Sequence, residues 1–237
     1  MKLKHIFAIF KKQVLDVPQN RGILFNFLIF PLFTLLFILL KSDSSEIYRM
    51  QIVMSMSATF TGMTPFTAIS GIIREDKLTN VTRMLILSTV KPLEYLLGLT
   101  LYIMAISSLI AVFFGLIGGF AGISLLGFVL SVMLGTFTSL VFSSMLTIQT
   151  KNPSGAARAV SLIAIFNGMI PTFAASNPAL MKIARFWYTV QIKDLIGDVF
   201  DCYYLNIPER LLIIGVNLAV FTVLFAILFK KNKIIEK

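Results

Sequence analysis

Charged side chains are scarce in this chain, and the two signs are unequal. Asp, Glu, Lys and Arg make up 14% of its 237 residues, whereas a soluble domain carries about 25%. Hydrophobic residues make up 57%, and the mean hydropathy is +0.88. This composition leaves no room for a sizeable soluble domain. It predicts one all-α integral membrane domain that covers residues 1–237.

Cysteine and histidine each occur once, as Cys202 and His5. A single cysteine excludes an intrachain disulfide and a cysteine-rich metal site. His5 lies in the N-terminal segment, where we interpret it as a polar-face residue, so an intramembrane Ser–His protease is disfavoured. The sequence also has no Gly-x-x-x-x-Gly-Lys-Ser/Thr loop for nucleotide phosphates. We therefore predict no catalytic residue, no metal site and no cofactor bound by this chain.

Long apolar segments recur along the chain. At 1.5 Å per residue, a helix of about 20 residues crosses the roughly 30 Å core of a bilayer. The second segment is rich in methionine and hydroxyl side chains, which are typical of adaptable helix–helix contacts in lipid. Two interpretations stay open for it: a tightly packed central helix, or the lining of a substrate path. The predicted spans are 22–40, 51–73, 93–120, 125–148, 156–175 and 211–229.

Three amphipathic segments lie outside the spans. Residues 1–21 are basic and predict an interfacial helix. Residues 74–92 open with four consecutive charges, continue with apolar residues at helical spacing and end at a proline. Residues 176–210 contain aromatic clusters and two apolar stripes, which predict two short helices in an interface. The apolar face of the first segment consists of Leu3, Ile6, Phe7, Phe10 and Val14.

The basic residues fix the expected orientation. With six spans, both termini and residues 74–94 and 149–158 share one side, which holds 15 basic and 5 acidic residues. The opposite side holds 6 of each. Because positive residues stay inside, we predict a multi-pass protein of the cell membrane with both termini cytoplasmic. The net charge of +10 then follows from topology and gives no reason to expect a nucleic-acid partner.

Two stretches of the chain are similar to motifs of a known family. The first runs from Glu75-Asp76-Lys77-Leu78-Thr79 to Leu85-Ile86-Leu87-Ser88-Thr89-Val90. It resembles the coupling helix of the ABC-2 type exporter permeases. Leu78 stands where the family usually has glycine, and Thr89 where it often has proline. The second runs from Asn167 to Tyr188. The resemblance covers nearly the whole chain and points toward bacterial peptide exporters, including those for phenol-soluble modulins.

The resemblance implies the type V exporter fold: six transmembrane helices, an N-terminal interfacial helix, a cytoplasmic coupling helix and an extracellular reentrant region. It implies ATP-driven export of an amphipathic or hydrophobic substrate, with a peptide toxin or antimicrobial peptide as the expected cargo. The chain itself would not be an enzyme. Two copies of a separate ABC ATPase would bind ATP and magnesium. A second permease, as a homodimer or as a related chain, would complete the unit. The implied coupling residues are Glu75, Asp76, Val81, Met84 and Leu85.

No acidic or basic residue lies deep in a predicted span, which disfavours an ion-coupled transporter and suits an amphipathic cargo. An asparagine within a span has an alternative role as an interhelical hydrogen-bond partner. The outer aromatic cluster of Phe186, Trp187 and Tyr188 could form either an exit gate or a headgroup belt. The candidate path residues are Met54, Ser57, Thr61, Thr64, Asn167 and Met169.

Other functions fit the same sequence. The architecture could carry a lipid, a drug or haem in place of a peptide. A non-transport immunity membrane protein is a further alternative, and it predicts that residues 75–87 tolerate change. Membrane lipid is an expected partner in every case.

Overall fold

The structure is a computed structural model, and it describes residues 2–16, 21–40, 45–79, 81, 90–148, 153–201 and 205–235. Within these ranges every regular element is a helix. The helices are α1 (Leu3–Asp16), α2 (Arg21–Leu40), α3 (Glu46–Leu78), α5 (Pro92–Ile117), α6 (Gly122–Ile148), α7 (Pro153–Ser176), α8 (Pro178–Ala184), α9 (Tyr188–Phe200) and α10 (Ile207–Ile235).

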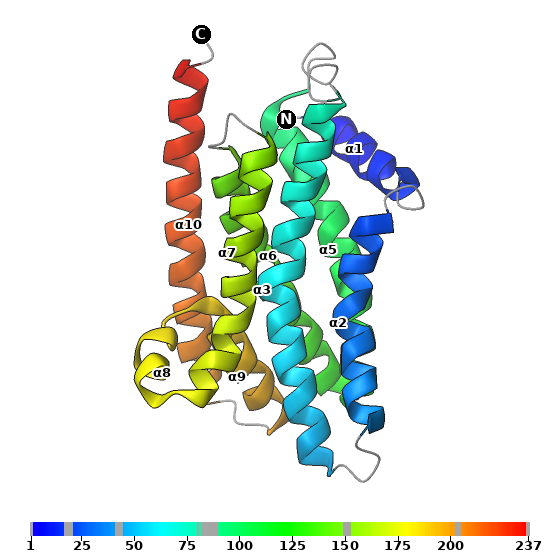
Figure 1. Cartoon of the computed structure of the whole chain (residues 1–237), viewed down its shortest axis with the longest axis vertical. Helices are drawn as coiled ribbons and strands as arrows, with labels where there is room; N and C mark the ends of the chain where they lie inside the picture. The colour runs from blue at the N-terminus through cyan, green and yellow to red at the C-terminus, as the bar shows by residue number, and fades with distance from the viewer. Residues whose placement is uncertain are drawn as a thin grey trace.

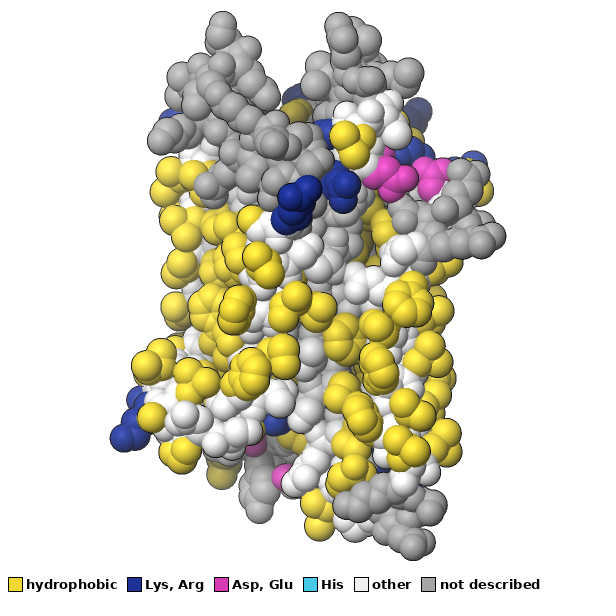
Figure 2. Space-filling model, viewed as in Figure 1, with side chains coloured by type: hydrophobic (Ala, Val, Ile, Leu, Met, Phe, Trp, Pro, Cys, Tyr) yellow, Lys and Arg dark blue, Asp and Glu magenta, His cyan; other side chains and the backbone are white. Residues whose placement is uncertain are grey.

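Six of these helices are long and apolar enough to cross a membrane: α2, α3, α5, α6, α7 and α10. They run side by side as a bundle, with both termini at the same end (Figure 1). The short helix α1 lies across that end, and α8 and α9 lie at the other end. This agrees with the six predicted spans and the two short helices predicted before the last one. Figure 2 shows a broad apolar belt around the middle of the bundle, with charged side chains gathered toward its ends.

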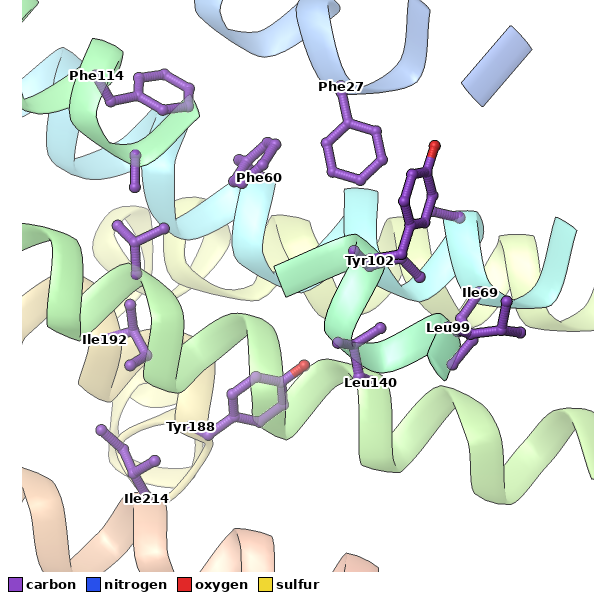
Figure 3. Packing of buried hydrophobic residues seen from close by; sticks show 14 of the residues in the cluster. Phe27, Phe60, Ile69, Leu99, Tyr102, Phe114, Leu140, Tyr188, Ile192 and Ile214 are labelled. Atoms are coloured by element: carbon purple, nitrogen blue, oxygen red, sulfur yellow. The ribbon is translucent and has the colours of Figure 1, made fainter. Parts of the chain in front are cut away.

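Helix α3 lies at the centre of the bundle. Phe60 of α3 makes edge contacts with Phe27 of α2, at 6.1 Å between ring centroids, and with Phe114 of α5, at 5.6 Å (Figure 3). Helix α7 approaches α3 so closely that a Cβ added at Gly62 would lie 2.9 Å from the Cα of Gly168. Small residues permit such approaches in membrane bundles. The central-helix interpretation of the second span is therefore supported by its packing.

Charged residues near the α8–α9 end form a local cluster. The guanidinium of Arg210 lies 3.2 Å from a carboxylate oxygen of Asp194 and 3.2 Å from one of Asp198. Burial raises the pKa of Asp194 above its ordinary value, and the Arg210 charge opposes that rise. Side chains of α9, including Ile192, Leu195 and Ile196, are buried in the bundle, as their predicted stripe requires.

The four charged residues 74–77 belong to the last turns of α3 and do not begin a separate helix. Residues 80 and 82–89 lie outside the described residues, so the predicted coupling helix is described only at its two ends. Helix α5 then begins at Pro92, where a proline costs no hydrogen bond because the first amide of a helix has no partner within it.

Candidate functional site at the junction of α1, α3 and α5

Three elements meet where α3 ends and α5 begins. Helix α1 packs against α5 at the same end of the bundle as both termini (Figure 1). Two carboxylates are buried at this junction, Asp76 near the end of α3 and Glu94 in the first turn of α5, with 4% and 1% of their surfaces exposed. Buried carboxylates require donors, since an unpaired buried charge is costly. Each carboxylate is bound by at least one group from another helix.

Asp76 is bound by two donors. Lys12 of α1 places its Nζ 2.8 Å from one carboxylate oxygen, and Tyr95 of α5 donates its hydroxyl to the other at 2.6 Å. Lys12 also lies 3.6 Å from Asp16 on its own helix. Asp76 therefore joins α1, α3 and α5 at one point.

Three groups bind the Glu94 carboxylate. The backbone amide of Lys2 donates to one oxygen at 2.7 Å, and Nδ1 of His5 lies 2.7 Å from the other. The backbone amide of Lys91 donates to that second oxygen at 3.2 Å, so the Glu94 side chain satisfies the amide just before α5. His5 is thus more than a polar-face residue, because it fixes the start of α1 to α5.

Close packing supports these polar contacts. Ile6 and Ile9 of α1 are buried against α5, and a Cβ added at Gly98 would lie 2.7 Å from the Cβ of Ile9. The predicted apolar face of α1 is divided: Ile6 faces the protein, whereas Leu3 and Phe7 are exposed. Those exposed side chains still suit contact with lipid at an interface.

The polar contacts of the junction link one helix to another. Its carboxylates are held by a lysine, a histidine, a tyrosine and backbone amides, and they form ties between helices. Helices α3 and α5 are the described helices on either side of residues 79–91, so the junction lies where that segment leaves one helix and enters the other. Lys12 of α1 and Tyr95 of α5 both bind Asp76 of α3, so the three helices are held together at this carboxylate.

The predicted coupling residues occupy different environments. Glu75 is exposed, whereas Asp76 is buried and already bound by Lys12 and Tyr95. Asp76 therefore does not present its carboxylate to a partner in this structure. Val81 is half-buried. Met84 and Leu85 lie outside the described residues.

The candidate path residues on α3 are mostly occupied by helix packing. Ser57, Thr61 and Thr64 are fully buried. Ser57 donates to the carbonyl of Val53 at 2.6 Å, and Thr61 donates to that of Ala58 at 2.8 Å. Thr64 donates to the α2 backbone and Met54 packs on Gly197. Met169 of α7 is the candidate with an exposed side chain.

Asn167 is the centre of a buried hydrogen-bond network. Its amide group donates to the carbonyl of Gly62 at 2.7 Å and to the hydroxyl of Tyr188, and its oxygen accepts from the indole of Trp187 at 2.7 Å. Tyr188 also shares a hydrogen bond of 2.7 Å with Ser139 of α6. The network joins α3, α6, α7 and the start of α9. This supports the interhelical role of Asn167.

The outer aromatic cluster is likewise divided. Tyr188 is completely buried, and burial raises its pKa to about 12, so the phenol stays neutral. Trp187 is half-buried and packs on Phe142 and Phe221. Only Phe186 of the three is exposed, as a headgroup belt requires. Tyr188 thus lies in the core, and Trp187 packs against that core while part of its surface stays exposed.

Several residues of the junction were missed by sequence reasoning. Lys12 and Tyr95 gave no signal. They lie 64 and 19 positions from Asp76 in the sequence, so they meet it only in the folded chain. Glu94 did give one: it stands three residues after Lys91 and two after Pro92, the spacing of a capping box. Ser139 could not be distinguished from other hydroxyl residues of its span.

No protein-family model matches the chain, and no curated protein matches it. The class of protein is defined by the fold. Over the residues described it is an all-helical protein, and six of its helices are able to cross a membrane. Membership of the ABC-2 permeases stays a prediction from residues 74–92 and 167–188.

Proposed function

We propose that this chain is the transmembrane permease subunit of an ATP-driven ABC exporter. Its cargo would be an amphipathic or hydrophobic substrate, with a peptide toxin or antimicrobial peptide as the first choice. The six candidate spans, the interfacial helix α1 and the two short helices before α10 support this architecture. ATP and magnesium would bind to a partner ATPase present in two copies, and a second permease copy would complete the exporter.

The observation that carries the proposal is the tie between the two ends of the predicted coupling segment. Tyr95, at the start of α5, donates to Asp76, at the end of α3, and Lys12 adds α1 to the same point. A push on the residues between these helices would therefore move α1, α3 and α5 together. Such a joined unit suits a rigid-body switch between two states of a transporter.

The buried position of Asp76 changes its proposed role. It would transmit movement inside the permease, while the exposed Glu75 would contact the ATPase. The predicted path residues on α3 are packed within the chain, so a substrate path between two permease copies fits the geometry better than one through a single bundle.

A charge reversal at Glu75 tests the proposal. Glu75→Lys should lower export about tenfold while membrane insertion stays intact, because it reverses the charge only at the proposed contact. Glu46→Lys is the matched control: it makes the same change in the first turn of α3, at the opposite end of the bundle. Export is measured from cells, and ATP hydrolysis from the purified complex.

The tagged protein should also co-purify in mild detergent with a nucleotide-binding subunit. Hydrolysis stimulated by amphipathic peptides would support peptide export, and hydrolysis that peptides do not affect would favour a lipid, drug or haem cargo. Unchanged export by Glu75→Lys would refute the coupling role of this residue. Recovery of no ATPase would refute the exporter and favour a non-transport membrane protein.

A further inference from the structure

A hollow of about 390 Å³ opens on the surface between the end of α3 and the start of α7. It is lined by Arg74 of α3 and by Arg158, Ser161, Leu162 and Ile165 of α7. The junction and the buried Asn167 network contain none of these five residues.

Both arginines in the hollow are exposed. Among the residues that the structure describes, no carboxylate lies within ion-pair distance of either guanidinium. Two neighbouring positive charges without a counter-charge repel each other. An anionic ligand would remove that repulsion, and a guanidinium binds phosphate through two parallel hydrogen bonds.

The arginines stand at the boundary between charge and apolar surface. Arg74 directly follows the buried Ile73, and Arg158 is the first residue of the apolar window of α7. Figure 2 shows basic side chains over the upper ends of α3 and α7, directly above the apolar belt. Side chains at this depth would meet lipid headgroups.

A line of exposed apolar side chains continues from Arg158 along α7. Its members recur at helical spacing, so they share the face on which Arg158 lies. Leu162 is 60% exposed and Phe166 is 68% exposed. The line consists of Leu162, Ile165, Phe166, Met169 and Phe173. The surface is thus polar and cationic at one end and apolar over the next three turns.

We propose that this hollow is a binding site for an anionic phospholipid. The phosphate lies between the guanidiniums of Arg74 and Arg158, and an acyl chain follows the exposed line on α7. Charge complementarity selects an anion, and the continuous apolar line selects a ligand with a long hydrocarbon chain over free phosphate. Basic pockets between transmembrane helices bind anionic headgroups in this way. This inference does not depend on the proposed transport function.

The test measures lipid retention by the full-length protein. The purified chain is exchanged into detergent micelles that contain dioleoyl-phosphatidylglycerol or dioleoyl-phosphatidylcholine, and bound lipid is counted by native mass spectrometry. We expect the wild type to retain one phosphatidylglycerol in preference to phosphatidylcholine. The double variant Arg74→Gln/Arg158→Gln should bind that lipid about tenfold more weakly, since each basic residue contributes separately to anionic-lipid binding.

The matched control is Lys4→Gln/Lys11→Gln, which removes two exposed charges from α1 at the same end of the bundle. It should retain phosphatidylglycerol within about twofold of the wild type. A second variant, Arg74→Lys/Arg158→Lys, keeps the charge and should bind better than the glutamine variant, which covers the case in which the glutamine variant does not fold.

Four results would overturn the proposal. Three of them are equal retention of the two lipids by the wild type, full retention by the glutamine variant, and an equal loss in the α1 control. The last would show that general surface charge, and not this hollow, holds the lipid. Competition by inorganic phosphate with no effect of acyl chain length would reassign the hollow to a soluble anion.

Discussion

The ion pair between Lys12 and Asp76 predicts an unequal pair of mutants. Lys12→Met removes the cation but leaves the Asp76 carboxylate, whose side chain is 6% exposed. Of its two donors, only Tyr95 then remains. Asp76→Asn removes the buried charge and leaves Lys12, whose side chain is 36% exposed and can turn toward water or Asp16. A buried carboxylate without its cation is the more costly outcome.

The magnitudes follow from this difference in burial. Removal of one partner of a buried ion pair costs at least about 3 kcal/mol. We expect this lower value for Lys12→Met, because the Lys12 side chain is partly exposed. Asp76→Asn should cost about 1 kcal/mol, the net value of an ordinary hydrogen bond. The double variant should also cost about 1 kcal/mol, since neither charge then needs a partner. The two sites should therefore be strongly coupled in a double-mutant cycle.

Hydrogen exchange of the α1 amides, read by mass spectrometry in nanodiscs, measures the docking of this helix. We expect exchange in Leu3–Asp16 to be on the order of 100-fold faster in Lys12→Met and about fivefold faster in Asp76→Asn. Lys11→Met is the matched control, because Lys11 is exposed on the same helix. If Lys12→Met exchanged no faster than Asp76→Asn, the argument from burial would be wrong.

Three further predictions concern other contacts. Gly98→Leu should release α1, because the new side chain would overlap Ile9, and α1 should then exchange as fast as an unprotected peptide while the six spans stay protected; retained protection would refute the close approach. Asn167→Ala should destabilise the bundle by about 2 kcal/mol in mixed-micelle unfolding, and Asn26→Ala by about 0.6 kcal/mol. The reason is that the Asn167 side chain makes three hydrogen bonds, whereas that of Asn26 donates one. Equal losses of stability would contradict the network. Leu85→Asp should reduce recovery of the proposed partner ATPase, because a carboxylate is costly in an apolar contact. Undiminished recovery would place this segment on lipid.

The sequence alone determined the number of spans and their approximate limits. Apolar segments such as 22–40 and 211–229 must be helical in lipid, because only a helix satisfies its own backbone there. The two short helices before the last span were equally predictable, since Asn177, Pro178 and the apolar stripe of Ile192, Leu195 and Ile196 are local signals. These features depend on neighbours in the chain, so no fold was needed to find them.

Only the tertiary structure decided which polar residues face solvent and which face each other. Glu75 and Asp76 are adjacent and chemically alike, yet one is exposed and the other is buried between Lys12 and Tyr95. Tyr188 follows Phe186 by two residues, yet it is in the core while Phe186 is exposed. A side chain's partner depends on how distant helices pack. Helical periodicity assigns a residue to a face of its own helix, but it does not say which other helix covers that face.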